Sequence, residues 1–273
     1  MTGITGGLGT EAHRTTVLAQ IELAHGRSRR RFSATFVATW IALVLLFGGG
    51  AWLASGADIN FVFTSGPVIL SGAGMTILVS ALSITFATGL ALLGAMARLS
   101  THPIPNGVGS FYVSLFRGTP LLLQIIFMYY ALPYVGIRLP ALAAGVLALS
   151  LNYGAYMTEI FRAGIQAVPR SQREAGRALG MPERLVMRRI VMPQAVRIVI
   201  PAVGNEFIAM IKDSSLVSVI TIHETLFLAQ RIGRSAFEPV AALLVAGAVY
   251  WTLTIIFSLF QDRLERRLAR SDR

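Results

Sequence analysis

Polar side chains recur at helical spacing inside an apolar stretch of the chain. Asn152, Tyr156 and Glu159 stand at positions i, i+4 and i+7, so a helix would place all three along one face. A carboxylate inside a membrane-spanning segment is a candidate functional residue, because an unpaired charge in lipid is costly. Alternatively, Glu159 pairs with Arg162 one turn on and only anchors its helix. The sequence leaves both interpretations open.

A second set of polar residues interrupts the apolar stretch 196–220. Glu206 and Asp213 share a helical face, and Asn205 and Lys212 share another, each pair at i and i+7. Such residues must face protein or a water-filled path. We expect Asn205 and Glu206 to line that path. Lys212 has two interpretations, because it either faces the same path or closes a buried ion pair with Asp213.

The composition shows what surrounds these side chains. Of 273 residues, 54% are hydrophobic and only 14% are charged. Average soluble domains carry about 25% charged residues, so much of this surface must face lipid. The chain has no cysteine, which excludes disulfides, thiolate zinc sites and a cysteine nucleophile. Its histidines are scattered, and we predict no metal site, no cofactor and no catalytic residue.

Charge-free gaps locate the helices that must carry the polar residues. A spanning helix needs about 20 apolar residues. The gaps long enough lie between Arg31 and Asp58, Asp58 and Arg98, Arg117 and Arg138, Arg138 and Glu159, and Glu238 and Asp262. The helical part of the second gap is predicted at 68–97. The third opens with Gly118-Thr119-Pro120, which is typical of an ordinary helix start with Arg117 at the membrane boundary.

The arginines set the orientation. Both tails are basic, and five spans would place them on opposite sides of the membrane. A sixth span is therefore required, and we place it at 196–220, where the polar residues would hide it from a hydropathy filter. With six spans, most of the 24 basic residues lie inside and both termini are cytoplasmic. The net charge of +11 is then explained by topology, and no nucleic-acid partner is expected.

The longest cytoplasmic connection in this topology is 163–197. Ser171 precedes Glu174 by three residues, which is the spacing of a capping box, so a short helix is predicted to start there and stop at Gly180. A second helix follows, and Pro193 ends or kinks it. From spacing alone, this helical hairpin either docks another protein or lies on anionic lipid headgroups.

The same loop carries a resemblance to a known family. Its motif resembles the EAA loop of ATP-binding-cassette importer permeases, with Gly176 in place of the usual second alanine; the motif residues are Glu174, Ala175, Gly176, Gly180, Ile190 and Pro193. Further blocks are similar to the polar amino-acid permeases within that family, namely 116–120, 152–162, 204–207 and 212–216. Together they cover about residues 68–267 and favour the docking interpretation of the loop.

The resemblance implies an all-α membrane protein. We expect a polytopic helical bundle of about six transmembrane helices, with a type I ABC importer permease core plus an extra N-terminal span, since many relatives have five spans. The implied parts are a basic cytoplasmic N-tail at 1–32, the extra helix and an outer loop at 33–67, the permease domain at 68–262 with its coupling loop at 163–197, and a basic cytoplasmic C-tail at 263–273.

The function implied is translocation of polar amino acids across a bacterial plasma (inner) membrane. In that family the EAA loop sits in a groove of a separate ATPase subunit, a periplasmic or lipid-anchored binding protein delivers substrate, and a second permease, identical or similar, completes the path. The chain itself is not expected to be an enzyme, because it lacks Gly-x-x-x-x-Gly-Lys-Ser/Thr. A substrate ammonium would pair with Glu159 while Asn152 and Tyr156 offer hydrogen bonds.

One alternative belongs to a different class. An ion-coupled secondary transporter or channel for small polar solutes would also place polar residues on spanning helices. Such a carrier has no reason to hold an EAA-like hairpin in the cytoplasm, which favours the importer. An intramembrane enzyme would need a nucleophile and base, or metal ligands, at one depth, and the sequence offers neither.

Overall fold

The computed structural model describes residues 32, 35–56 and 58–270. It divides the chain into two compact units, Met1–Ala57 and Asp58–Arg273. The described residues form helices and no strands. Apart from Phe32, the predicted N-tail at 1–32 lies outside the described residues, as do the last three residues of the predicted C-tail.

The first unit contains one long apolar helix. It runs over Thr35–Ala54, is apolar and long enough to cross a membrane, and includes a π-helical turn η1, Leu45–Gly49, and the segment α2, Gly50–Ser55. Gly56 then takes a positive φ of 66°, which ends the helix in the way that glycine permits. The helix lies where the first span is predicted.

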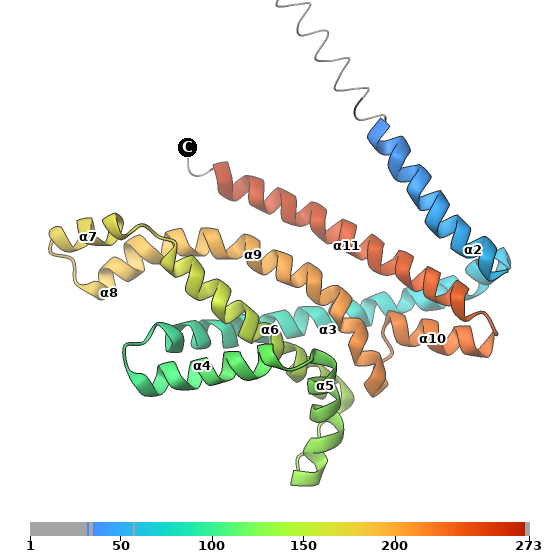
Figure 1. Ribbon diagram of the computed structural model, residues 1–273, viewed down its shortest axis with the longest axis horizontal. Coiled ribbons are helices and arrows are strands. Elements are labelled where there is room, and N and C mark those ends of the chain that lie inside the picture. Colours follow the sequence, from blue (N-terminus) through green and yellow to red (C-terminus); the bar gives the residue numbers. More distant parts are fainter. Residues whose placement is uncertain (1–31, 33–34, 57, 271–273) are drawn as a thin grey trace, which may run out of the picture. The chain divides into compact units, whose positions relative to one another are not determined.

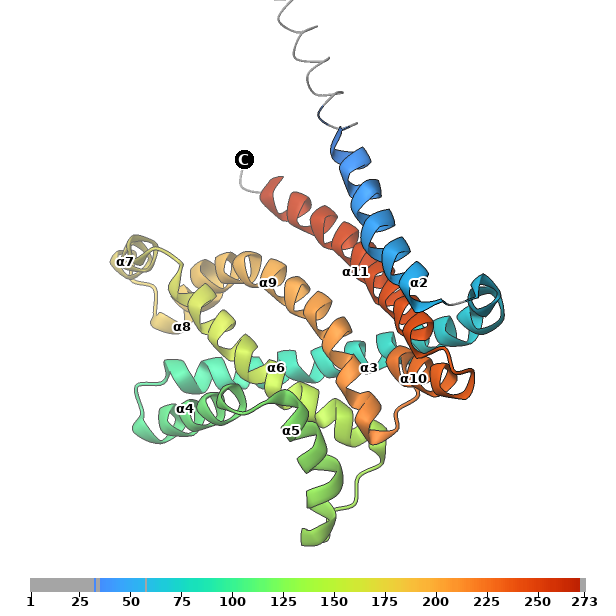
Figure 2. The same cartoon turned by 45° about the vertical axis from the view of Figure 1, so that its right-hand side comes forward.

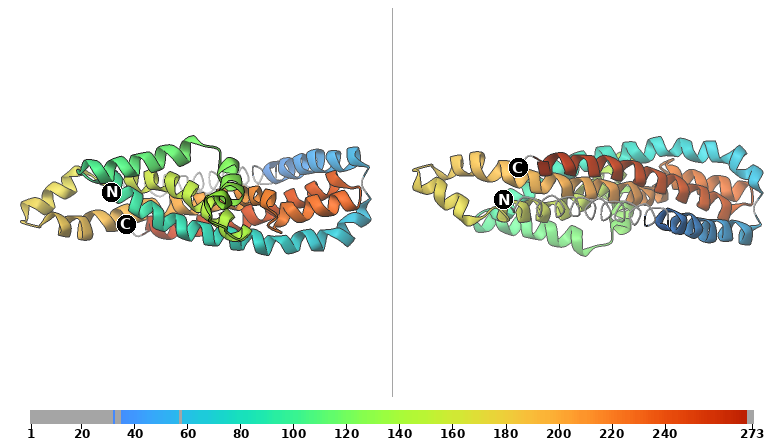
Figure 3. Two further views of the ribbon diagram at one scale, coloured as in Figure 1. Left: turned by 90° about the horizontal axis from the view of Figure 1, so that it is seen from below. Right: turned by 90° about the horizontal axis from the view of Figure 1, so that it is seen from above.

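The second unit holds the remaining helices (Figure 1). They are α3 (Ile59–Leu99), α4 (Pro103–Gly118), α5 (Leu121–Ile126) with the turns η2 (Phe127–Ala131) and η3 (Leu132–Val135), α6 (Ala141–Gln166), α7 (Arg170–Ala178), α8 (Glu183–Val186), η4 (Met187–Val191), α9 (Met192–Asp213), η5 (Ser214–Ile220), α10 (Thr225–Ser235) and α11 (Pro239–Arg270). Within this unit, α7 and α8 lie at one end and α10 at the opposite end (Figure 3).

The helix α6 is at the centre of the second unit. About two thirds (67%) of the residues in the most apolar stretch of α6 are buried, against 22% in the corresponding stretches that contain α9 and α11. It contacts α3, α4 and α9, and Figure 2 shows it running between α4 and α9. Glycine permits the close approach to α3, since a Cβ at Gly94 would overlap the side chain of Thr158. Residues on α6 are therefore held by several elements at once.

The helix α3 is longer than the predicted span at 68–97. It begins at Ile59, and Asp58 caps it by accepting a hydrogen bond of 3.0 Å from the backbone N–H of Asn60. Pro67 lies inside the helix without ending it. At the far side of the unit, Gly72 packs against the backbone of Thr225, the first residue of α10; a Cβ there would lie 2.7 Å from that backbone.

A buried carboxylate holds the start of α10. The side chain of Glu224 is fully buried, and its oxygens accept from the backbone N–H groups of Leu226 (2.8 Å) and Phe227 (2.7 Å) and from the hydroxyl of Tyr250 on α11. These bonds satisfy two N–H groups that a helix start leaves unpaired. The carboxylate therefore joins α10 to α11, and these hydrogen bonds compensate for its burial.

The number of spans agrees with the prediction of about six. In the described part of the chain five helices are apolar and long enough to span, or six if one bent pair is a single span. The predicted sixth span is part of a 38-residue helix, Glu183–Ile220, which passes a hydropathy test. The expectation that hydropathy would miss it is wrong, because the polar pairs Asn205-Glu206 and Lys212-Asp213 lie within an otherwise largely apolar segment.

The third predicted span is one arm of the bent pair. Pro103–Gly118 and Leu121–Val135 meet at 103°. The bend falls at Thr119 and Pro120, where Thr119 has an extended backbone (φ −117°, ψ 145°), as a residue before proline prefers. The segment between Arg98 and Arg117, taken as a simple connection in the sequence, contains nearly all of α4, Pro103–Gly118. The bend, not a lone helix start, is what Gly118-Thr119-Pro120 forms.

The coupling loop (163–197) forms the predicted pair of helices, with two corrections. Pro169 precedes the first residue of α7 and no side chain caps this helix, so the predicted capping box of Ser171 and Glu174 is absent. Gly180 does stop the helix, with φ +75° and its N–H donating to the carbonyl oxygen of Arg177 (2.9 Å). Pro193 does not end the second helix; it follows the π-helical turn η4, and the chain continues directly into α9.

Candidate functional site

A polar cavity lies beside the bend between α4 and α5. It has a volume of about 570 Å³, and we call it the bend cavity; its lining residues are Arg117, Gly118, Thr119, Pro120, Leu121, Asn152, Tyr153, Tyr156, Glu206 and Asp213. Asn152, Tyr156 and Glu206, all predicted path residues, are among them. The bend, α6 and α9 thus bring together side chains that are far apart in the sequence.

Two amides hold the wall of the bend cavity. Gln124 Nε2 donates to the carbonyl oxygens of Phe116 (2.9 Å) and Thr119 (3.1 Å) and to Thr119 Oγ1 (2.7 Å). Asn152 Nδ2 donates to the same Phe116 oxygen (2.9 Å) and to Gln124 Oε1 (3.1 Å). The bend exposes carbonyl groups that no helix satisfies, and these amides satisfy them. Asn152 therefore fixes the shape of the wall.

The charges of the bend cavity come from two helices. On α4, the guanidinium carbon of Arg117 lies 5.0 Å from the centre of the Tyr156 ring, within the range of a cation–π contact. On α9, Glu206 and Asp213 face the cavity, and Asp213 Oδ2 accepts a hydrogen bond of 2.8 Å from the Tyr153 hydroxyl. One cation therefore faces two carboxylates across a space large enough for a small zwitterion.

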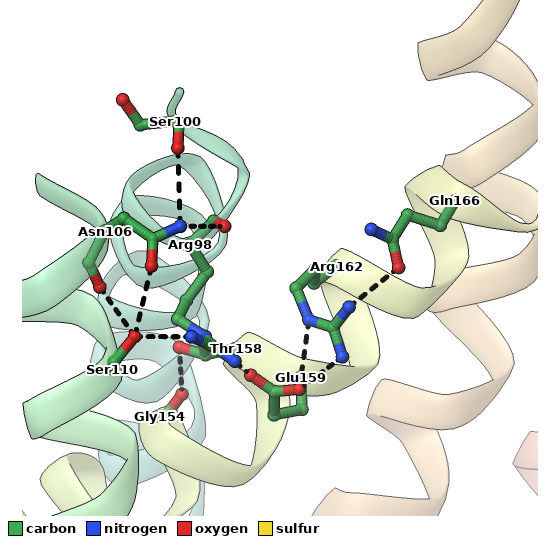
Figure 4. Close-up of polar contacts among 9 residues, drawn as sticks. All are labelled: Arg98, Ser100, Asn106, Ser110, Gly154, Thr158, Glu159, Arg162 and Gln166. Atoms are coloured by element: carbon green, nitrogen blue, oxygen red, sulfur yellow. Dashed lines mark hydrogen bonds and ion pairs between the residues drawn. The ribbon is translucent and has the colours of Figure 1, made fainter. Parts of the chain in front are cut away.

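Glu159 lies outside the lining of the bend cavity. Its Oε1 is 3.1 Å from Arg98 Nε, and its Oε2 is 2.6 Å from Arg162 Nη2 (Figure 4). The ion pair with Arg162 that the spacing predicts is therefore present. Arg98 adds a second partner from α3 that the sequence did not indicate.

The other two predicted path residues lie on an exposed surface of α9. Asn205 and Lys212 are both exposed and do not line the bend cavity. Within residues 58–270, Lys212 makes no ion pair, so the alternative of a pair with Asp213 is not formed. Neighbouring residues on a helix point about 100° apart, and Asp213 instead accepts from Tyr153.

Sequence reasoning undervalued some of the lining residues. Arg117 looked like a boundary arginine and Asp213 like half of an ion pair, while Tyr153 and Thr119 gave no signal of their own. A usable signal was present in the pairing of Asp213 with Glu206 at i and i+7. The bend itself was the missing information, because Gly118, Thr119 and Pro120 at the bend line the cavity together with Arg117.

The coupling loop is a second candidate site. Gly176 is buried, and a Cβ there would lie 2.7 Å from Ile190 Cδ1, so α7 sits directly on the second helix of the hairpin. Glu174 and Ala175 are exposed, and Leu179 at the end of α7 is 82% exposed. The motif residues therefore divide into a packed side and an exposed side.

Arginines connect α7 to its neighbours. Arg177 Nη2 lies 2.9 Å from Glu183 Oε2 across the turn, and the guanidinium lowers the pKa of the Glu183 carboxyl below its usual value. Arg173 Nη2 donates to the carbonyl oxygen of Ile165 (2.6 Å), near the end of α6. A small hollow of about 300 Å³ lies among Arg170, Arg173, Glu174 and Arg177. In the described residues, no group of three histidine or carboxylate side chains is placed to hold a metal ion.

Comparisons with known proteins identify relatives of the chain. A family described as "Binding-protein-dependent transport system inner membrane component" matches residues 87–270. The L-cystine transport system permease protein TcyB of Bacillus subtilis is 40% identical over 205 residues, which cover 75% of this chain and 88% of that protein. The arginine transport system permease protein ArtQ of the same organism is 35% identical over 207 residues, 76% of this chain and 94% of that protein.

A solved structure has the same fold. The crystal structure of an amino acid ABC transporter with histidines includes a chain with 37% identity and a TM-score of 0.74, and the match covers 77% of this chain and 99% of that one. A chain of the MetNI methionine ABC transporter, at 16% identity and a TM-score of 0.65, shares the fold alone.

Proposed function

The chain belongs to the family of binding-protein-dependent transport system inner membrane components, and we propose that it is the permease subunit of an ATP-binding-cassette importer that carries polar amino acids. Its relatives are permeases named for cystine and arginine. Membership of this family removes the reason for considering an ion-coupled secondary carrier.

The charge arrangement of the bend cavity carries the proposal. A free amino acid presents a carboxylate and an ammonium a few ångströms apart. Arg117 offers a planar set of donors that suits a carboxylate, and Glu206 and Asp213 offer acceptors for the ammonium. The side chain of the substrate would occupy the rest of the roughly 570 Å³. Polar amino acids therefore match the cavity better than uncharged solutes do.

The path extends beyond the bend cavity in this proposal. Asn205 and Lys212 are exposed on a spanning helix, and such side chains need protein or water beside them. We assign them to the contact with a second permease, homologous or identical, where Lys212 would meet a substrate carboxylate. Asn152 shapes the wall, Tyr156 and Glu206 contact the substrate, and Glu159 acts at a distance from it.

The coupling loop supplies the link to an energy source. We assign the exposed side of α7, with Glu174 and Ala175, to the groove of a separate ATPase subunit, while Gly176, Gly180, Ile190 and Pro193 shape and support the hairpin beneath it. ATP hydrolysis belongs to that partner, and a periplasmic or lipid-anchored binding protein would deliver the amino acid. The family description names an inner membrane component, and the arginine distribution supports cytoplasmic termini.

Reconstitution tests this function. The chain is placed in proteoliposomes with its ATPase subunit, and its solute-binding protein is supplied together with labelled cationic, neutral polar and acidic amino acids. We expect ATP-dependent uptake of at least one class, and a loss of about tenfold or more in R117Q, since one charge-assisted contact contributes about 1.5–3 kcal/mol. Amino-acid uptake that does not depend on ATP, or no uptake of any amino acid, would overturn the proposal.

A further inference from the structure

The carboxylate of Glu159 joins three helices near the end of the unit that carries α7. Its Oε1 accepts from Arg98 Nε on α3 (3.1 Å), and its Oε2 accepts from Arg162 Nε (3.0 Å) and Nη2 (2.6 Å) on α6 itself (Figure 4). The Arg98 guanidinium also donates to Ser110 Oγ on α4. One carboxylate thus connects α6 to α3 directly and to α4 through Arg98.

The connection to α4 is reinforced by hydrogen bonds from side chains to backbone carbonyl groups. Asn106 Nδ2 donates to the carbonyl oxygens of Arg98 (2.9 Å) and Ser100 (3.3 Å), so the end of α3 and the start of α4 are tied together. Ser110 Oγ, which accepts from Arg98, donates to the Asn106 carbonyl oxygen (2.7 Å). Arg98 is therefore bonded to α4 through both its side chain and its backbone carbonyl oxygen.

Close helix packing supports the same assembly independently of charge. A Cβ at Gly109 on α4 would lie 3.1 Å from Ala97 Cβ and 3.3 Å from Arg98 Cγ. One turn earlier on α3, a Cβ at Gly94 would overlap Thr158 Oγ1 on α6. Backbones that approach this closely leave little freedom for one helix to slide past another.

The same end of α6 is attached to the coupling loop. Arg162 Nη1 donates to Gln166 Oε1 (2.7 Å) in the last turn of α6, and Arg173 of α7 donates to the Ile165 carbonyl oxygen (2.6 Å). Seven residues before Glu159, Asn152 lies on the same face and holds the Phe116 carbonyl oxygen at the wall of the bend cavity. Arg117, the next residue, lines that cavity.

We infer that Glu159 is a positioning residue that joins the parts of α3, α4 and α6 nearest α7, so that they move as one body with α7. Displacement of α7 would then reach the wall of the bend cavity. The inference rests on the proposed function. Glu159 does not contact substrate in this role, because guanidinium groups occupy both of its oxygens and it does not line the cavity.

The charges around the site fit this role. The side chains of Arg98, Glu159 and Arg162 are only 27%, 19% and 29% exposed. Removing one partner from a largely buried ion pair leaves the others uncompensated. Loss of the carboxylate would leave two facing guanidinium groups, which repel and would separate α3 from α6.

The test uses the complete transporter in proteoliposomes and compares uptake with ATP hydrolysis. In E159Q, which keeps the side-chain volume, we expect uptake per ATP to fall about tenfold, within the roughly 5–150-fold range of allosteric coupling. Hydrolysis should lose its dependence on the loaded binding protein, while the KM for the amino acid stays unchanged. D58N, which neutralises a carboxylate at the opposite end of α3, should behave as wild type.

A variant of the partner residue and a double variant make the outcome decisive. R98Q should reproduce the defect, and R98Q combined with E159Q should be no worse than either alone, because both break one connection. A raised KM or altered amino-acid selectivity in E159Q would assign Glu159 to the substrate and overturn the inference. Normal uptake per ATP in E159Q would overturn it as well.

Assembly is checked by co-purification of the ATPase subunit. If E159Q does not assemble, R98K provides the readout, because lysine keeps the charge but cannot bind Glu159 and Ser110 through one planar fork. A partial loss of coupling in R98K supports the inference, and wild-type coupling there contradicts it. Wild-type protein measured alongside separates the two proposals, since ATP-driven uptake by wild type upholds the transport function whatever Glu159 does.

Discussion

The guanidinium of Arg117 lies over the ring of Tyr156, 5.0 Å from its centre. Arg117 is the penultimate residue of α4 and Tyr156 belongs to α6, yet both line the bend cavity. An aromatic face attracts a cation without using its N–H donors. The contact therefore orients Arg117 and keeps those donors available for a substrate carboxylate.

Removing the Tyr156 ring tests this orientation. Because a cation–π contact contributes about 0.5–2 kcal/mol, we expect the KM for amino-acid uptake to rise about 2–30-fold in Y156A. Y156F keeps an aromatic face and should stay within about twofold of wild type. Uptake in proteoliposomes measures both variants, and equal KM values for Y156A and Y156F would contradict the role of the ring.

Glu206 is the carboxylate best placed for a substrate ammonium, because Asp213 already accepts from Tyr153. In E206Q the KM should rise about 10–100-fold, which corresponds to the roughly 1.5–3 kcal/mol of a charged hydrogen bond. Uptake by D58N provides the control for loss of a carboxylate elsewhere. An unchanged KM in E206Q would move the ammonium site to Asp213 or out of the cavity.

Two glycines on one helix turn form a matched pair for stability. A Cβ at Gly72 would lie 2.7 Å from the Thr225 backbone, whereas a Cβ at Gly74 meets nothing within 4 Å. G72A should destabilise the protein by about 1–3 kcal/mol, the usual cost of overpacking. G74A should be neutral or stabilise by about 0.5–1 kcal/mol, because alanine favours helix. Thermal unfolding in detergent compares G72A with G74A, and equal melting temperatures of the two variants would contradict the prediction.

Gly176 tests the packing inside the coupling loop. Alanine gains helix propensity of about 0.5–1 kcal/mol but must displace the end of the Ile190 side chain, 2.7 Å away. We expect these effects to offset one another, so G176A should keep uptake within about twofold of wild type. G176L has no space against Ile190 and Val186 and should lose ATP-driven uptake. Retention of the ATPase subunit by G176L on co-purification would argue against this explanation.

The exposed ion pair between Arg177 and Glu183 predicts a pH dependence with a definite sign. Arg177 lowers the pKa of the folded Glu183 carboxyl, so its contribution is present above the ordinary glutamate pKa of about 4.3 and disappears as the pH falls through the lower folded value. After division by the intrinsic amide exchange rate, which itself falls toward acid pH, deuterium exchange of the α7 backbone should therefore accelerate as the pH falls. In E183Q this acid-side acceleration should be smaller; an identical profile would rule out the ion pair as its cause.

The arginines and the charge-free gaps were enough to predict about six spans. The spacing of polar residues put Asn152, Tyr156 and Glu159 on one helical face, and of these Asn152 and Tyr156 line the bend cavity. Periodicity along one helix is a local property. The 103° bend was not predictable in this way. Thr119-Pro120 is equally suited to a helix start and to a bend, and only the packing of Asn152 and Gln124 against the exposed carbonyl groups selects the bend.

Local rules also failed where a neighbouring residue had a stronger preference. The Ser171 capping box was plausible by spacing, but Pro169 fixes the chain so that α7 begins at Arg170. Lys212 and Asp213 are adjacent in sequence, yet a helix points them in different directions. Glu224 gave no signal, because its partners come from the start of α10 and from Tyr250 on α11.

The uninterrupted run from α8 through η4 into α9 has a mechanical meaning. Residues Glu183–Ile220 form one helix of 38 residues, about 57 Å at 1.5 Å per residue. Glu206 lies about 29 Å along it from the start of the π-helical turn, so a tilt of only one degree about that turn moves the carboxylate by about 0.5 Å. The second helix of the hairpin is thus a lever arm, and small rotations in the coupling loop would be enlarged where α9 meets the bend cavity.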